Sequence, residues 1–239
     1  MSLSTAPALA PACFVVGTDT GVGKSRVSAA LLHSLARDGR RVVGMKPVAA
    51  GAAWLNGVWT SDDAVALRAA SNVAVPTALD NPVLLDEPLS PHLAAARMGR
   101  QIRLEPIVAA CNELRRRADA VVVEGAGGLM VPLSATLTGL DLAQALSLPL
   151  VLVVGLRLGC LNHALLTAAV IRQHGLTLAG WVANRIDPQM AGVDENIAYL
   201  RQHLSDHLGA PLLADLAWSG QPESDVATLA IDLPAGMRR

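Results

Sequence analysis

A glycine-rich loop near the start of the chain carries the strongest chemical signal. Residues 17–25 read Gly-Thr-Asp-Thr-Gly-Val-Gly-Lys-Ser, between an apolar run at 13–16 and a helical pattern at 24–37. Backbone N–H groups in such a loop, together with the helix N-terminus, surround phosphate oxygens. Lys24 would reach the β- and γ-phosphates of a nucleotide, and the Ser25 hydroxyl would coordinate Mg²⁺. The loop therefore predicts ATP and Mg²⁺ binding, although it is one residue longer than the usual spacing, which would place a glycine at Thr18.

Acidic residues elsewhere could complete the Mg²⁺ site. Mg²⁺ prefers hard oxygen ligands, few of them from protein. Glu124 follows a buried apolar strand, at the position where a second metal carboxylate is expected. Asp62 and Asp63 lie beside the flap at 49–60 and could supply a third ligand. Glu124 could instead cap the glycine turn that follows it, and each aspartate could equally be a helix N-cap.

Two further features lie next to predicted strand ends. Lys46 follows a strand and precedes Pro47, so its side chain emerges at the edge where the phosphate loop lies. A second lysine there would neutralise charge that develops on a transferred phosphoryl group, although such a lysine can also be an ordinary surface residue. Residues 159–162 open a long helix, whose free N–H groups could hold a carboxylate or a phosphate. Asn162 could also be a simple N-cap.

These residues must be positioned by an α/β framework. Continuous apolar strands are expected at 13–16, 41–45, 120–123, 150–154, 178–183 and 211–216, and helices at 24–37, 63–70, 88–97, 105–118, 140–146, 162–174 and 193–207. This alternation predicts one P-loop NTPase domain at 12–239, with a mostly parallel sheet flanked by helices on both faces. Ligands bind at the carboxyl ends of such strands. Residues 1–11 are expected to be a flexible tail.

Composition argues against several other classes of protein. The net charge is −1, only one Phe and one Tyr are present, and the one basic run is 115–117, so nucleic acid is not an expected partner. The most apolar stretch, 142–171, is interrupted by Pro149 and Arg157, which argues against a membrane span. Three widely spaced cysteines support neither disulfides nor a zinc site. With no basic segment in residues 1–11, a cytoplasmic location is expected.

Several strings taken together resemble the dethiobiotin synthetase family, from about Cys13 to Trp218. They are G-T-D-T-x-V-G-K-S at 17–25, G-M-K-P-V at 44–48, D-A-V-A-L at 63–67, V-E-G-A-G-G at 123–128, P-L-S at 132–134, V-V-G-x-x-L-G-C-L-N-H-A at 153–164 and L-A-G-W-V-A-N at 178–184. The longer phosphate loop is itself a mark of that family. The resemblance implies closure of a ureido ring on 7,8-diaminopelargonic acid with CO₂ and ATP, through a carbamate and its mixed anhydride with phosphate.

The resemblance also implies roles for individual residues. Thr20, Lys24 and Lys46 would be catalytic, and Ser25, Asp63 and Glu124 would hold Mg²⁺, with Asp63 rather than Asp62 matching the family string. The implied nucleotide-binding set comprises Gly21, Val22, Gly23, Lys24, Ser25, Asp63, Glu124, Gly125, Ala126, Gly127, Asn184, Arg185, Ala217, Trp218 and Ser219. The implied substrate-binding set comprises Lys46, Ala50, Gly159, Cys160, Leu161 and Asn162, the last four contributed by the other subunit of a homodimer.

Some positions depart from the family pattern. Gly21 stands where an acidic residue is frequent, Ala50 where a serine would bond the substrate, and Ala217 where proline is common. The hydrogen bond that a serine would make to the substrate is absent with Ala50, which would cost about 0.5–1.5 kcal/mol of binding free energy if nothing replaces it. These departures concern substrate affinity and nucleotide selectivity rather than the class of reaction.

Two alternatives share the expected architecture. One is an ATPase switch like the septum-positioning and chromosome-partitioning proteins, which carry a signature lysine where this chain has Asp19. An anion at that position argues against the switch, as does the lack of a basic amphipathic C-terminal helix for membranes. The other is an amide-forming ligase of cobalamin synthesis, which would need a glutaminase domain for which we expect no room.

Overall fold

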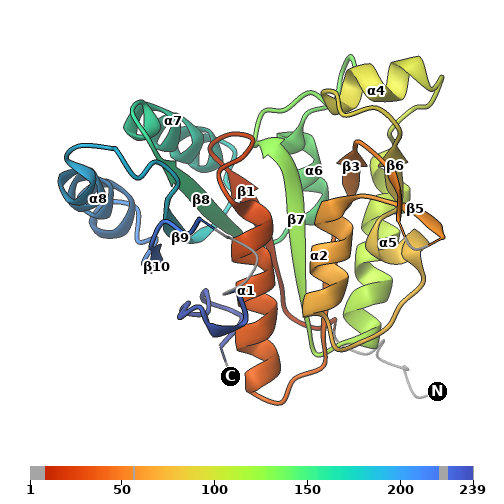
Figure 1. Cartoon of the computed structure of the whole chain (residues 1–239), viewed down its shortest axis with the longest axis horizontal. Helices are drawn as coiled ribbons and strands as arrows, with labels where there is room; N and C mark the ends of the chain where they lie inside the picture. Colours follow the sequence, from red (N-terminus) through yellow and green to blue (C-terminus); the bar gives the residue numbers. More distant parts are fainter. Residues whose placement is uncertain (1–8, 56, 221–225, 239) are drawn as a thin grey trace, which may run out of the picture.

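Six parallel strands form the central sheet, in the order β10-β9-β8-β1-β7-β2 (Figure 1). The structure, a computed structural model, describes residues 9–55, 57–220 and 226–238. The strands are β1 (Ala12–Gly17), β2 (Val42–Met45), β7 (Ala120–Gly128), β8 (Leu150–Leu156), β9 (Leu178–Arg185) and β10 (Leu212–Leu216). Their residues are apolar without alternation because both faces of the sheet are covered. The predicted parallel α/β architecture is confirmed.

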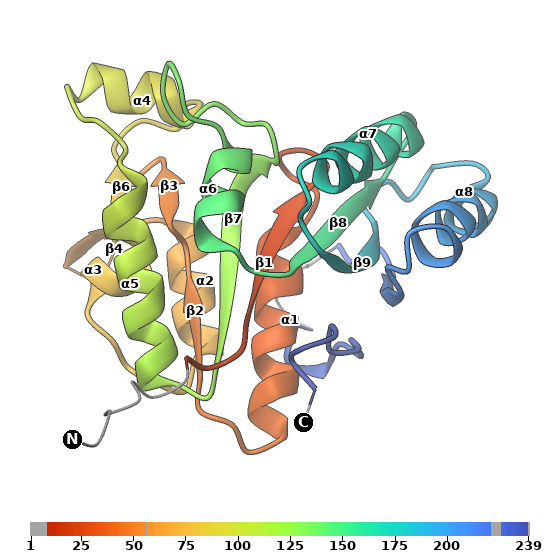
Figure 2. The ribbon, with the colours of Figure 1, turned by 180° about the vertical axis from the view of Figure 1, so that it is seen from behind.

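Helices cover the sheet on both sides. Helices α1 (Lys24–Arg37) and α2 (Asp62–Ala70) lie in front of the sheet in Figure 1. The view from behind in Figure 2 shows α5 (Leu104–Arg117), α6 (Gly139–Leu146) and α7 (Cys160–Gln173) on the opposite face. Helix α8 (Val193–Leu200) continues as a π-helix at Arg201–Asp206, within the helix predicted for 193–207. None of the helices in the described ranges is long and apolar enough to cross a membrane.

Two small sheets replace the predicted flap. Strand β3 (Val48–Ala50) pairs in parallel with β6 (Val83–Leu85), and β4 (Ala53–Leu55) pairs in antiparallel fashion with β5 (Val58–Thr60). Helices α3 (Thr77–Asp80) and α4 (Pro91–Arg97) flank this region, and α4 begins three residues later than predicted, with Pro91 in its first turn. The sequence did not reveal these strands because three-residue strands are too short to display a period.

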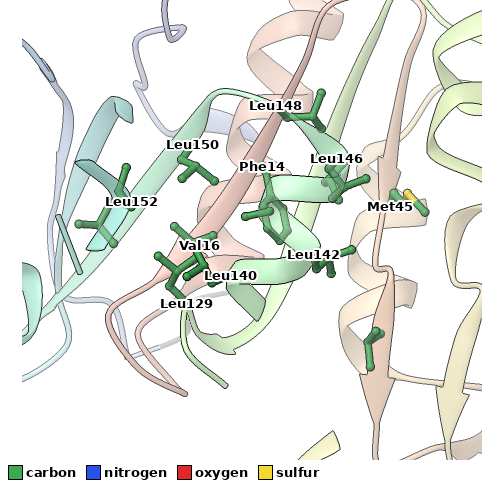
Figure 3. Packing of buried hydrophobic residues seen from close by; sticks show 14 of the residues in the cluster. Phe14, Val16, Met45, Leu129, Leu140, Leu142, Leu146, Leu148, Leu150 and Leu152 are labelled. Atoms are coloured by element: carbon green, nitrogen blue, oxygen red, sulfur yellow. The ribbon is translucent and has the colours of Figure 1, made fainter. Parts of the chain in front are cut away.

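Two hydrophobic cores fix the strands from opposite sides. Phe14 and Val16 of β1, Met45 of β2 and Leu142 of α6 belong to the first core (Figure 3). The alternate side chains, such as Val15 of β1, pack with α1 in the second core. Because consecutive residues of a strand point to opposite faces, an apolar residue is needed at almost every position. This packing holds the carboxyl ends of β1, β2 and β7 close together.

Described residues near both ends of the chain are hydrogen-bonded to the rest of the domain. Residues 1–8 of the predicted tail lie outside the described residues, but Ala10 donates a backbone hydrogen bond to Arg115 O and accepts one from Arg115 Nε. Pro11 O accepts from Val121 N, so the predicted tail is too long by at least Ala10 and Pro11. Near the other end, Met237 is buried and its carbonyl accepts from the Arg40 guanidinium at 2.6 Å.

Candidate nucleotide-binding site

The phosphate loop joins β1 to α1 at the carboxyl edge of the sheet. Thr18 N donates to Val153 O at 3.0 Å, which ties the loop to β8. Helix α1 starts at Lys24, and Gly23 at its N-cap has a φ of 91°. A Cβ on Gly23 would lie 2.1 Å from Asn184 Nδ2, so only glycine fits. The first N–H groups of a helix are not used within the helix, so the start of α1 is suited to binding an anion.

Four polar side chains from different elements meet beside this loop. The Ser25 hydroxyl lies 2.7 Å from Asp63 Oδ1 and 2.9 Å from Glu124 Oε1. The Lys46 ammonium lies 2.7 Å from Asp63 Oδ2 and 2.7 Å from Glu124 Oε1, and donates to Gly125 O at 3.1 Å. These residues come from α1, β7, the start of α2 and the end of β2. The structure thus brings together Ser25, Asp63, Glu124 and Lys46, whereas Asp62 makes no contact with the cluster in the described interactions.

Burial controls the charges of this cluster. The pKa of Lys24 is lowered to about 8, first by burial and then by the neighbouring Lys46 ammonium, against the attraction of Glu124, Asp63 and Asp19. Burial also opposes the charge on Lys46, but Glu124 and Asp63 outweigh it and raise the pKa of Lys46. Attraction by Lys46 likewise outweighs burial at Asp63 and lowers its pKa. Complete burial raises the pKa of Glu124 in spite of Lys46.

The donor set of the cluster fits a magnesium ion. Ser25, Asp63 and Glu124 offer one hydroxyl and two carboxylates, which are hard oxygen donors of the kind Mg²⁺ prefers. Glu124 Oε2 is buried and has no hydrogen-bond partner within the described part of the chain, so it retains an unused acceptor. The described residues contain no group of three or more His, Cys, Asp or Glu side chains that could hold a metal ion. The remaining ligands would therefore come from phosphate and water, as is usual for Mg²⁺.

A cleft of about 680 Å³ opens over the cluster. One wall consists of the phosphate loop and the cluster itself, including Thr20 and Lys24. The opposite wall comes from β3 and from the segment that leads into α4, with Ala50, Leu89 and Ser90. Other predicted site residues that line the cleft are Gly21, Gly23, Ala126 and Gly127. The cleft leaves room for a small molecule between the second wall and the phosphate loop; the contribution of the segment before α4 was not predicted from the sequence.

Asn184 lies on the far side of the phosphate loop. Its Nδ2 donates to Val22 O at 2.8 Å, and its Oδ1 accepts from Arg26 Nη1 at 3.1 Å. Arg26 Nη1 also donates to Ala217 O at 3.1 Å. Arg26 therefore links the loop, the end of β9 and the segment after β10. Arg26 was not predicted as a site residue, because a helical arginine next to the motif gives no signal of such long-range contacts.

Other residues of the predicted nucleotide-binding set lie at the end of β9 and directly after β10. The Arg185 guanidinium pairs with Asp215 at 2.8 Å and with Asp194 at 2.6 Å, and these hydrogen bonds raise the pKa of Arg185. Trp218 is exposed. Ser219 follows Trp218 directly. The Arg185 guanidinium is thus paired with two carboxylates. The Trp218 ring, beyond β10, is accessible to a ligand.

The start of α7 does not enter this cleft. Gly159 is the N-cap of α7, with a φ of 96°, and Cys160 is buried while Asn162 is exposed. Neither Gly159, Cys160, Leu161 nor Asn162 is among the residues that line the cleft. Arg157, just before the helix, pairs with Asp19 of the phosphate loop. This ion pair was not predicted, because the two residues are 138 positions apart.

Comparisons with known proteins agree with this geometry. A family model described as "AAA domain" (AAA_26) matches residues 12–223. The fold is similar to the ParA family ATPase from Chlorobium tepidum TLS, at 15% identity and a TM-score of 0.54, over 92% of this chain and 90% of that chain. It is also similar to the cell division ATPase MinD from Pyrococcus furiosus, at 18% identity and a TM-score of 0.52, over 86% and 83%.

A third structure is the septum site-determining protein MinD from Pyrococcus horikoshii OT3, solved as a complex with Mg-ADP. Its identity is 17% and its TM-score 0.50, over 86% of this chain and 81% of that chain. At these identities the three structures show the shared fold. The family model spans most of the chain and includes the phosphate loop and the residues clustered around it. This protein therefore belongs to the AAA domain family and has a P-loop NTPase fold.

Proposed function

We propose that this protein is an ATP-dependent ligase that closes a ureido ring on 7,8-diaminopelargonate with CO₂, giving dethiobiotin, ADP and phosphate. The observation that carries the proposal is the position of Lys46. Its side chain is only 3% exposed, is paired with Asp63 and Glu124, and lines the cleft between the phosphate loop and β3. A buried ammonium at this point can stabilise the negative charge of an anion bound against the second wall and also that of the terminal phosphate.

The chemistry requires two bond-forming steps after carbamate formation. One amine of the substrate adds to CO₂ and loses a proton, which gives the carbamate. A carbamate oxygen attacks the γ-phosphorus of ATP, the bond to ADP breaks, and a carbamic-phosphoric anhydride forms. The second amine then attacks the carbonyl carbon, expels phosphate and loses a proton, which closes the ring. Each step places negative charge between Lys24, Lys46 and the loop N–H groups, which stabilise it.

The phosphate end of ATP fits the loop from residue 17 to residue 25. Ser25, Asp63 and Glu124 would hold Mg²⁺, which when bound neutralises charge on the β- and γ-phosphates. The Mg-ADP bound by the Pyrococcus horikoshii MinD supports a magnesium nucleotide here. Thr20 lines the cleft and would approach the reacting carbamate. Ala50 lines the second wall and offers no side-chain hydrogen bond to the substrate.

The adenine end is proposed to lie beyond β9 and β10. Asn184 would recognise the base after giving up one of its two present contacts, and Arg185, Ala217, Trp218 and Ser219 would surround it. The link from Asn184 through Arg26 to Ala217 supports this assignment, because it joins the base region to the phosphate loop. Gly125, next to Glu124, supports the phosphates indirectly, since its carbonyl accepts from Lys46.

The substrate carboxylate is proposed to bind at the start of α7 of a second subunit. Within one chain, residues 159–162 do not line the cleft. They could therefore contact a substrate in the cleft only across the interface between two subunits. Free N–H groups at a helix N-terminus suit a carboxylate. The proposed homodimer would therefore complete the substrate site.

An ATPase switch of the septum-positioning or chromosome-partitioning type remains the alternative, and the fold is compatible with it. Asp19 argues against it, because this carboxylate pairs with Arg157 of the same chain and offers no cation to a partner's nucleotide. The second wall of the cleft also favours a ligase, since hydrolysis of ATP needs no second small molecule.

Phosphate release from MgATP, with and without 7,8-diaminopelargonate and bicarbonate, tests the proposal. We expect release that depends on both, with a product that carries one additional carbonyl bridge, identified by mass spectrometry. Hydrolysis that is indifferent to the diamine would reject the ligase and favour the switch.

A further inference from the structure

Three aromatic side chains contact one another in sequence, from the end of α8 to the residue that follows the π-helix. The rings of Tyr199 and His203 are parallel, with centres 4.0 Å apart and an interplanar angle of 22°. The rings of His203 and His207 have centres 5.2 Å apart and an interplanar angle of 75°. None of the three lines the nucleotide cleft, so this cluster is separate from the site described above.

The hydrogen bonding of His203 fixes which nitrogen is available. His203 Nδ1 lies 2.8 Å from the backbone carbonyl of Tyr199. A carbonyl oxygen only accepts, so Nδ1 carries the hydrogen and donates it, and the lone pair of His203 is on Nε2. This is the arrangement found for metal-ligating histidines, whose second nitrogen donates to a carbonyl or a carboxylate. Stacking on Tyr199 further restricts the orientation of the ring.

The spacing of the two histidines matches a chelating pair. Residues four apart lie on the same face of a helix, and His203 and His207 occupy such positions around the π-helix, an element that often marks functional sites. Imidazole nitrogens bind Zn²⁺ at about 2.0–2.1 Å, which places the centres of two rings that share one ion roughly 5 Å apart. The observed ring separation of 5.2 Å is therefore compatible with one shared ion.

We propose that His203 and His207 form a binding site for a borderline divalent transition metal such as Zn²⁺, Ni²⁺ or Cu²⁺. Imidazole suits these metals, whereas Mg²⁺ prefers oxygen ligands and would remain in the cleft. The described residues provide no group of three or more His, Cys, Asp or Glu ligands, so water completes the coordination and affinity is modest. His207 is exposed and His203 partly so, which leaves the site open to an ion from solution.

Calorimetric titration of the whole protein with ZnCl₂, in excess Mg²⁺ to occupy the cleft, tests this site. We expect one Zn²⁺ per chain, with affinity at least tenfold lower in His203→Gln and in His207→Gln, and unchanged in Tyr199→Phe, which keeps the backbone carbonyl. His174→Gln is the matched control, because it removes a histidine outside the cluster. Equal Zn²⁺ affinity in the double variant His203→Gln/His207→Gln, or no binding to the unmodified protein, would overturn the proposal.

A second measurement does not depend on the variants. Electron paramagnetic resonance of the protein with one equivalent of Cu²⁺ reports the ligating nitrogens through their hyperfine coupling. Two imidazole nitrogens on one ion are expected. A spectrum with one nitrogen or none would overturn the proposal even if the histidine variants failed to fold.

Discussion

Lys46 and Glu124 form an ion pair that is almost completely removed from solvent: Nζ lies 2.7 Å from Oε1, and the two side chains are 3% and 1% exposed. The pair joins the end of β2 to β7, two neighbouring strands of the sheet. A buried charge is tolerated only when it is paired and hydrogen-bonded. Lys46 meets this condition through Glu124, Asp63 and Gly125 O, so its charge is held at the cleft before any ligand arrives.

The first prediction concerns Lys46 itself. Lys46→Ala should reduce turnover at least a hundredfold, because it removes the charge that would stabilise the transferred phosphoryl group and the carbamate. MgATP binding should remain within a few-fold of the unmodified protein, since Lys24 and the loop N–H groups are retained. Single-turnover kinetics and calorimetric MgATP binding separate the two effects. Preserved turnover with lost nucleotide binding would contradict the assigned role.

The same substitution should also destabilise the fold. It leaves Glu124 buried without its partner, and breaking a buried ion pair in this way typically costs about 3–5 kcal/mol of unfolding free energy. Because burial raises the pKa of Glu124, protonation of the carboxyl should recover part of that loss. Urea unfolding of Lys46→Ala measures the effect, and activity should be compared only at temperatures where the variant is folded.

Adjacent aspartates offer a matched test of the metal site. Asp63 contacts both Ser25 and Lys46, whereas Asp62 contacts neither in the described interactions. Asp63→Asn should raise the Mg²⁺ concentration for half-maximal activity at least tenfold, because it removes an anionic oxygen donor. Asp62→Asn should leave that concentration unchanged. If both variants shifted equally, an effect on α2 as a whole would explain the result instead of a lost ligand.

The third prediction compares alanine substitutions at Gly23 and Gly39, to separate the effect of a steric clash from that of backbone strain. Gly23→Ala adds a Cβ that would lie 2.1 Å from Asn184 Nδ2, in a residue whose φ is 91°. Gly39→Ala is the control, because its φ of 74° imposes similar strain while no heavy atom lies within 4 Å of the added Cβ. Left-handed strain alone costs about 1–2 kcal/mol. Thermal unfolding should show a larger loss for Gly23→Ala, accompanied by weaker MgATP binding that Gly39→Ala does not cause.

Much of the fold could be predicted because its strands are long, apolar and separated by helical patterns. The sequence placed the end of the third strand before Glu124, but β7 continues to Gly128, since pairing with β1 at Gly17 overrides the low strand propensity of glycine. Strands β3 and β6 were missed because three residues show no period. Local patterns cannot reveal long-range partners, which explains why Arg26 and Arg157 were overlooked.

The candidate site was more predictable at strand ends than elsewhere. Lys46 directly follows β2 and obeys the general rule for parallel sheets, in which side chains after strands converge at one edge, whereas Glu124 lies inside β7. Asp63 was harder to choose, since Asp62 and Asp63 are adjacent and both begin α2. Spacing could not decide between them; the family string favoured Asp63, and the structure places that side chain in the cluster. The wall formed by the start of α4 gave no sequence signal because its residues are apolar or small.

The last prediction uses the capping box of α6 to test pH dependence. Asp141 Oδ2 accepts from Thr138 N at 2.7 Å and from Thr138 Oγ1 at 2.6 Å, and these bonds lower the pKa of Asp141. A carboxyl whose pKa is lowered on folding stabilises the protein above its unfolded pKa, and loses that contribution as the pH falls through the folded pKa. Asp141→Asn should therefore cost about 1 kcal/mol at pH 7, the usual value of a cap, and progressively less below about pH 4. Urea unfolding at both pH values measures the difference, with Asp206→Asn, an exposed aspartate in the π-helix, as control. A difference between the unmodified protein and Asp141→Asn that stays constant with pH would mean that ionisation of the Asp141 carboxyl does not contribute to the capping box of α6.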